Sequence, residues 1–175
     1  MDTTFIAYKA EDLIAHKLER EGILVAKPKF DRDGCDLLAL LSVKEGASFC
    51  RIQCKGRSFF NSNKTHIDIP SRYVTDSLIV FLYLEETKEK DCLYCFFPED
   101  IRAWNKNDKD EYILSIGKTT YEEKLRLHHF DPSMISRIKY LISCANATRE
   151  LRMIIGTANI DMPALSVSGK STVSN

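Results

Sequence analysis

The sequence lacks any apolar run that approaches the roughly 18 residues needed for a membrane helix. Residues 1–5 also lack the basic segment and following apolar stretch that mark a secretory signal. We therefore expect a cytoplasmic protein without a membrane partner, with its six cysteines reduced. Cys92 and Cys95 have the spacing of half a zinc site, but no second pair completes it, so we interpret them as small core residues.

The sequence also lacks an excess of charge of either sign. Its 25 basic and 25 acidic residues give a net charge of +0, which is no general signature of nucleic-acid binding. Between positions 50 and 74, however, basic residues outnumber the single acidic residue, Asp68; they are Arg51, Lys55, Arg57, Lys64 and Arg72. Phosphate binding depends on local potential, so this segment is compatible with a DNA partner. The alternative is an ordinary solvated basic loop.

What is present is enough hydrophobic sequence for one folded core. Hydrophobic residues make up 44% of the 175 positions and charged residues 29%, as is typical of a globular domain. We expect a main domain over residues 1–130, a helical extension over 131–160, and a tail over 161–175. The tail is rich in Ser, Thr and Gly, which predicts disorder.

Hydrophobic periodicity predicts a mixed α/β domain built on a central sheet. Residues 9–21 have the apolar spacing of a helix, and Gly22 follows as its C-terminal cap. Residues 37–43 and 78–84 form nearly continuous apolar runs, which are typical of strands buried on both faces. The remaining predictions are strands at 23–26, 49–55, 66–69, 92–97 and 112–116, with helices at 98–104 and 132–155.

The most informative residues are Asp36, Gln53 and Lys55. Asp36 follows a turn signal and begins one predicted strand, while Gln53 and Lys55 lie two apart on the next. Side chains alternate between the faces of a strand, so Gln53 and Lys55 share a face. A turn at 44–47 makes the two strands antiparallel. We therefore predict that Asp36 lies close to Gln53 and Lys55.

These residue types suit a divalent metal site. Magnesium prefers oxygen ligands, which Asp36, the Gln53 amide and the Cys54 carbonyl can supply. Glu11 lies within about 20° of Leu18 on the helical wheel, so it borders the core-facing stripe and can add a carboxylate. A bound metal activates water, and the ammonium of Lys55 can orient that water or stabilise the transition state.

The pattern of Glu11, Gly34-Cys35-Asp36 and Gln53-Cys54-Lys55 resembles the PD-(D/E)XK, or restriction-endonuclease-like, nuclease superfamily. Within it, the pattern is similar to archaeal Holliday-junction resolvases and to small homing or repair endonucleases. The resemblance spans about residues 9–97. It implies a restriction-endonuclease-like core, catalytic roles for Asp36, Gln53 and Lys55, Glu11 as an accessory ligand, and Mg²⁺ or Mn²⁺ as cofactor.

The same resemblance implies DNA, including branched DNA, as substrate, and a homodimer. Many members of the superfamily have glutamate or aspartate where this chain has Gln53. A neutral ligand there weakens metal binding, which leaves a second reading open. In that reading, the fold is a non-catalytic module that binds nucleic acid or protein through its basic face. In either case Arg57, Lys64 and Arg72 are the candidates for phosphate contacts, and the 132–155 helix could instead dock a partner.

Overall fold

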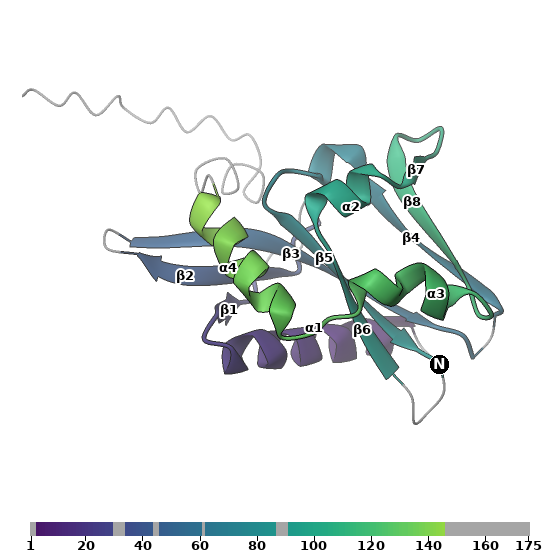
Figure 1. The fold of residues 1–175 in the computed structure, drawn as a ribbon, viewed down its shortest axis with the longest axis horizontal. Coiled ribbons are helices and arrows are strands. Elements are labelled where there is room, and N and C mark those ends of the chain that lie inside the picture. The colour runs from purple at the N-terminus through teal and green to yellow at the C-terminus, as the bar shows by residue number, and fades with distance from the viewer. Residues whose placement is uncertain (1–2, 30–33, 44–45, 61, 87–90, 146–175) are drawn as a thin grey trace, which may run out of the picture.

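The computed structural model describes residues 3–29, 34–43, 46–60, 62–86 and 91–145 (Figure 1). The longer helices are α1 (Thr3–Arg20) and α4 (Ser133–Cys144), and the shorter ones are α2 (Pro98–Arg102), α3 (Tyr121–Leu125), η1 (Ser71–Tyr73) and η2 (Arg126–His128). The strands are β1 (Leu24–Ala26), β2 (Leu37–Val43), β3 (Gly46–Ser58), β4 (Lys64–Pro70), β5 (Leu78–Glu85), β6 (Asp91–Phe96), β7 (Asn105–Lys106) and β8 (Glu111–Gly117).

The strands form two sheets. The larger has the order β1-β2-β3-β5-β6, in which β3 and β5 are parallel and the other neighbours are antiparallel. The predicted α/β class with a mixed central sheet flanked by helices is therefore confirmed. The strand predicted at 66–69 becomes β4, which leaves the central sheet and joins a smaller antiparallel sheet of order β4-β8-β7.

The central sheet separates two hydrophobic cores. The first core lies between this sheet and α1 and α4, with Ile14 and Ile138 among its fully buried members. The second core lies between the central sheet and the smaller sheet, together with α2 and α3, and includes Ile67 and Ile101. The helix α4 therefore packs in the same core as α1.

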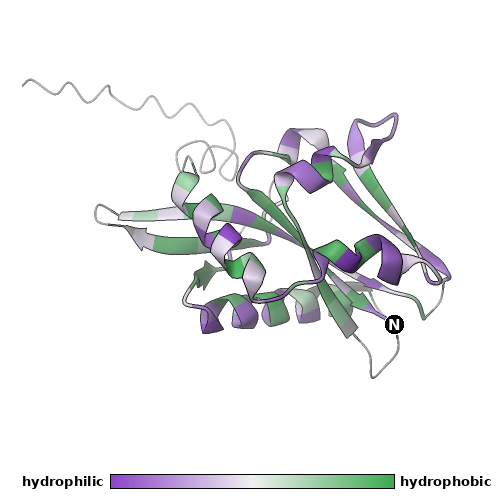
Figure 2. Cartoon of the chain, in the orientation of Figure 1, coloured by the Kyte–Doolittle hydropathy of each residue, from purple (hydrophilic) through white to green (hydrophobic). Residues whose placement is uncertain are grey.

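The central strand β5 contributes to both cores, and its hydrophobic character runs along its length in Figure 2. Phe81 and Tyr83 point into the first core, and the alternate residues Val80 and Leu82 point into the second. The prediction of two-sided burial is thus confirmed for this strand. For β2 it is wrong, because no β2 residue belongs to the second core, and Leu38 and Leu40 on that face are only partly buried.

The first helix is longer than predicted because its apolar stripe begins earlier. Ile6, Ala10, Ile14 and Leu18 recur every fourth residue and are buried. The helix ends where Gly22 adopts a positive φ of 76°, which allows the N–H of Ile23 to donate to the Leu18 carbonyl at 3.1 Å. The predicted glycine cap is therefore confirmed.

The last described helix is shorter than predicted. α4 ends at Cys144, because Ala145 has an extended backbone with a ψ of 135°. A continuous helix from 132 to 155 is therefore wrong at its C-terminal end. Residues 146–155 and the predicted disordered tail lie outside the described residues. Among the described helices, none combines the length and apolar character needed to cross a membrane.

Gly56 allows α1 to lie directly against β3. A Cβ atom added at Gly56 would meet the Ile6 carbonyl oxygen at 2.8 Å and its Cγ2 at 2.7 Å. We expect Gly56→Ala to lower the free energy of unfolding by about 1–3 kcal/mol, because backbone must move to admit the methyl group. Urea denaturation measures this change. Gly117→Ala is the matched control, since its Cβ would meet only the Thr120 hydroxyl, at 3.2 Å. Equal losses in both variants would contradict the close approach of α1.

Candidate active site at the β2–β3 edge

Asp36 lies against β3 at the point where β2 begins. Its N–H donates to the Ile52 carbonyl at 2.9 Å, and its Oδ2 accepts the N–H of Cys54 at 2.5 Å. The Cys54 N–H lies beyond the part of β3 that pairs with β2. The Asp36 carboxylate therefore takes the place of the backbone acceptor that a longer β2 would supply. The preceding Gly34 has a positive φ of 68°, which directs the chain into this position. The predicted proximity of Asp36 to this part of β3 is found.

Gln53 lies beside Asp36 on the same face of the sheet. Leu37 pairs with Ile52, so Asp36 and Gln53 are the next opposed residues along the two strands. The Gln53 side chain belongs to a residue that is only 7% exposed, and its Oε1 is buried without a hydrogen-bond partner among the described residues. Leaving a buried amide oxygen unsatisfied costs about 1–3 kcal/mol, so this atom is a candidate ligand.

A turn and an aromatic ring enclose the Gln53 amide. A Cβ added at Gly34 would lie 2.9 Å from both Gln53 Nε2 and Tyr73 Cδ2, so both groups border the space beside Gly34. Tyr73 belongs to η1, which lies between β4 and β5. Any side chain at position 34 would displace the amide or the ring.

Lys55 lies two residues beyond Gln53 on the same face and is partly buried. In the parallel ladder it is opposite Leu82 of β5, as Gln53 is opposite Val80. Both of those β5 residues belong to the second core. The shared face predicted for Gln53 and Lys55 is therefore the face that the smaller sheet covers.

Glu11 approaches from the other side of the central sheet. It lies on α1, which packs on the face that carries Ile52 and Cys54. Its carboxylate forms an ion pair with Lys27, the residue that follows β1, and the pair raises the pKa of Lys27. No sequence pattern pointed to Lys27, because its distance from Glu11 depends on where β1 ends relative to the helix.

The pKa of the Cys54 thiol depends on the charges around this edge of the sheet. Burial raises its pKa well above the usual value for cysteine, and the carboxylates of Asp36 and Glu11 raise it further. Both carboxylates therefore lie within electrostatic range of the same thiol, although α1 and Gln53 lie on opposite faces. At neutral pH the thiol stays protonated, which leaves the backbone carbonyl as the oxygen ligand that Cys54 offers.

The described residues hold no cluster of three or more His, Cys, Asp or Glu side chains of the kind that binds a metal ion. The donor set at this edge is instead one carboxylate, one amide oxygen and one backbone carbonyl, with Glu11 already neutralised by Lys27. Neutral oxygens of this type are accepted by magnesium and manganese when at least one carboxylate is present.

The basic residues predicted to contact phosphates differ in their surroundings. Lys64 and Arg72 are exposed, and Arg72 lies over the Tyr73 ring with 4.9 Å between guanidinium and centroid. Arg57 is partly buried and donates to the carbonyls of His66 and Gly56, at 2.8 and 2.9 Å. Burial lowers the pKa of Arg57 from its ordinary value. Arg57 therefore links β3 to β4 as well as carrying charge.

Arg51 is a functional candidate that sequence reasoning missed. It counted there as one of the basic residues of the 50–74 segment, yet it is fully buried, with 0% exposure. The only available signal was its spacing, since Arg51, Gln53 and Lys55 alternate along one strand and so share a face.

Neither a family model nor a curated protein matches this sequence. Among solved structures, the chain is similar to a bacterial homing endonuclease, with a TM-score of 0.49 and 14% identity, over 80% of this chain and 95% of that one. It is also similar to the Holliday junction resolvase of the archaeal hyperthermophile Archaeoglobus fulgidus, with a TM-score of 0.44 and 10% identity, over 75% and 95%.

The raised pKa of Cys54 predicts an unreactive thiol at the site. In the native protein at pH 7 to 8, we expect iodoacetamide to modify the exposed Cys144 well before Cys54, because only a thiolate attacks the reagent. Peptide mass mapping over time measures both rates, and Cys144→Ser identifies the fast site. Modification of Cys54 at the rate of Cys144 would mean that its thiol is accessible and ionised, contrary to the raised pKa.

Proposed function

We propose that this protein is a metal-dependent nuclease that hydrolyses phosphodiester bonds in DNA. The observation that carries the proposal is the buried Gln53 Oε1, which has no hydrogen-bond partner among the described residues and belongs to the residue opposed to Asp36 across the two strands. A buried polar atom is rarely left without a partner, and a cation would satisfy it. In the sequence, the same residues form the motif that resembles the nuclease superfamily.

The residues present fit a magnesium or manganese ion. Asp36, Gln53 Oε1 and the Cys54 carbonyl would hold it, and Glu11 would contribute through water or after exchange with Lys27. When bound, such an ion supplies Lewis-acid stabilisation of the charge that develops on the scissile phosphate.

In this proposal Lys55 has a second role. It shares the face of Gln53 and lies two residues further along β3, so its ammonium group can hydrogen-bond the attacking water and stabilise the developing negative charge. The exposed Lys64 and Arg72, with Arg57 between the two sheets, would contact phosphates of the strand and position it. Such contacts hold a substrate in register without reading its sequence.

A second candidate function is a non-catalytic module that binds nucleic acid on the same fold. Two observations favour this second function. Gln53 is neutral, and the Glu11 carboxylate is already paired with Lys27. Both reduce the negative charge available to a cation. In this function Lys55 would bind a phosphate, and no metal would be required.

Asp36→Asn and Lys55→Ala separate the two functions. With labelled duplex, single-stranded and four-way-junction DNA and Mg²⁺ or Mn²⁺, we expect metal-dependent cleavage that each substitution lowers about 100-fold or more. Lys118→Ala removes an exposed lysine far from Asp36 in sequence and serves as the control. Full cleavage by both site variants would exclude the proposed catalytic roles. DNA binding by the wild-type protein without metal binding or cleavage would favour the second candidate.

Gln53→Glu tests the consequence of the neutral ligand. Added negative charge should lower the Kd for Mn²⁺ about tenfold in a calorimetric titration, because the affinity of such sites follows ligand charge. Without metal, the variant should unfold at a lower temperature, since two carboxylates would then be close together in a buried place. Gln53→Leu, which offers no ligand atom, is the control and should weaken binding. A Kd unchanged by both substitutions would mean that Gln53 does not contact the metal.

A further inference from the structure

Arg51 is buried without any exposed surface, although arginine is rarely found inside a protein unless its charge is compensated. It lies on β3 two residues before Gln53 and points to the same face. Its guanidinium is therefore enclosed between the central sheet and the chain that crosses over it. A charged group in such a place must be held by well-directed acceptors.

Those acceptors lie in the connection between β4 and β5. Arg51 Nη2 donates to the Tyr73 carbonyl at 2.8 Å and to the Thr75 hydroxyl at 3.2 Å, and its backbone N–H donates to the Ser77 carbonyl at 3.2 Å. The Tyr73 carbonyl also accepts the N–H of Thr75, at 3.0 Å. The planar guanidinium thus holds the backbone carbonyl of Tyr73 and the side chain of Thr75, on either side of residue 74.

The residue that this anchor fixes, Tyr73, also lies beside the Gln53 amide. The Tyr73 ring and Gln53 Nε2 both border the space that a side chain at position 34 would occupy. If the backbone at residue 73 were released, the ring could move away and the amide could rotate. Tyr73 is therefore the residue through which an effect of Arg51 on Gln53 would pass.

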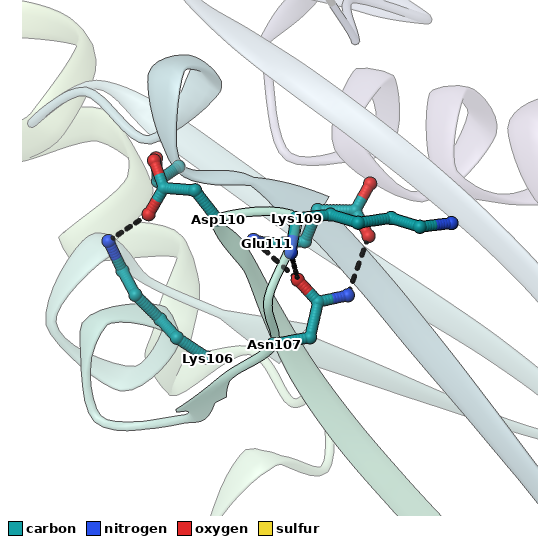
Figure 3. A network of polar contacts seen from close by, with 6 residues as sticks. Lys106, Asn107, Lys109, Asp110 and Glu111 are labelled. Atoms are coloured by element: carbon teal, nitrogen blue, oxygen red, sulfur yellow. Dashed lines mark hydrogen bonds and ion pairs between the residues drawn. The ribbon is translucent and has the colours of Figure 1, made fainter.

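The other end of the same segment is tied to the β7–β8 hairpin, which Figure 3 shows from close by. The Ser71 N–H donates to the Asp110 carbonyl at 2.9 Å, and the Ser71 hydroxyl donates to the Asp110 carboxylate. Lys106 pairs with the same carboxylate at 2.6 Å, and Asn107 donates to Glu111 at 2.8 Å. With Arg51 holding one end and Asp110 the other, the segment 71–75 is fixed at both ends.

We propose that Arg51 is a positioning residue that, through Tyr73, holds the Gln53 amide in a single orientation beside Asp36. The step from amide orientation to metal binding rests on the proposed nuclease function. The orientation of the Gln53 amide does not depend on a bound metal in this proposal, so it is measured in the metal-free protein. Arg51 contacts neither substrate nor metal in this proposal.

The test follows the side-chain amide signals of Gln53 by NMR in the full-length, metal-free protein, with Gln53→Leu to assign them. Because Arg51→Lys can fail to fold, the main variant is Thr75→Val, which has nearly the same shape and removes one acceptor of the guanidinium. We expect faster hydrogen exchange of the Gln53 amide and a shift toward the position of free glutamine. Thr65→Val on β4 is the matched control and should change neither.

A double variant tests whether the effect of Arg51 on Gln53 passes through Tyr73. Tyr73→Ala should produce the same change as Thr75→Val, and the double variant should add nothing, because both remove one linkage. Manganese affinity should fall about tenfold in each, as expected for residues that orient a ligand. Unchanged amide signals in a folded Thr75→Val and Arg51→Lys, or additive changes in the double variant, would overturn the role of Arg51. Absence of metal binding in the wild type would instead refute the nuclease proposal, while the amide signals would still decide this one.

Discussion

Two-sided burial of the parallel pair β3 and β5 is the constraint on which the rest of this structure depends. β5 sends alternate side chains into two separate cores, and β3 beside it must fill the same two layers. Apolar residues meet this demand toward α1. Toward the smaller sheet, β3 instead presents Arg51, Gln53 and Lys55, so polar groups must be satisfied inside the protein. Arg51 is satisfied by Tyr73 and Thr75, whereas Gln53 Oε1 has no hydrogen-bond partner among the described residues.

The smaller sheet covers the polar side chains of β3, so they form a partly buried site and not an exposed surface. Arg57 connects the strand to β4, and the connection 71–77 passes over Arg51 on its way back to β5. The residues proposed to carry chemistry are therefore packed by elements that come later in the chain. Their geometry depends on tertiary structure more than on the local propensity of β3.

Much of this arrangement could be predicted from sequence, because it depends on the alternation of side chains along strands and on the order of the strands and turns. Alternation along β3 and a tight turn before β2 were enough to bring Asp36 beside Gln53. The partners of those residues could not be predicted in this way. The pairing of Glu11 with Lys27, the anchoring of residue 73 by Arg51, and the departure of β4 into a second sheet all join segments that are distant in sequence. A local sequence pattern does not show which residues distant in sequence will come into contact. The one-sided burial of β2 has the same origin, since it depends on what covers each face of that strand.

The ion pair between Glu11 and Lys27 has a consequence for any cation that reaches this edge. The chain already supplies an ammonium group at the carboxylate, and the raised pKa of Lys27 keeps that group protonated at neutral pH. Occupation of Glu11 by a dissolved ion is then an exchange of one cation for another. Because the ammonium is tethered, its local concentration is constant, whereas that of the dissolved ion is set by the medium. A dissolved cation would therefore bind this carboxylate with a raised apparent Kd, because it must first displace the ammonium group of Lys27.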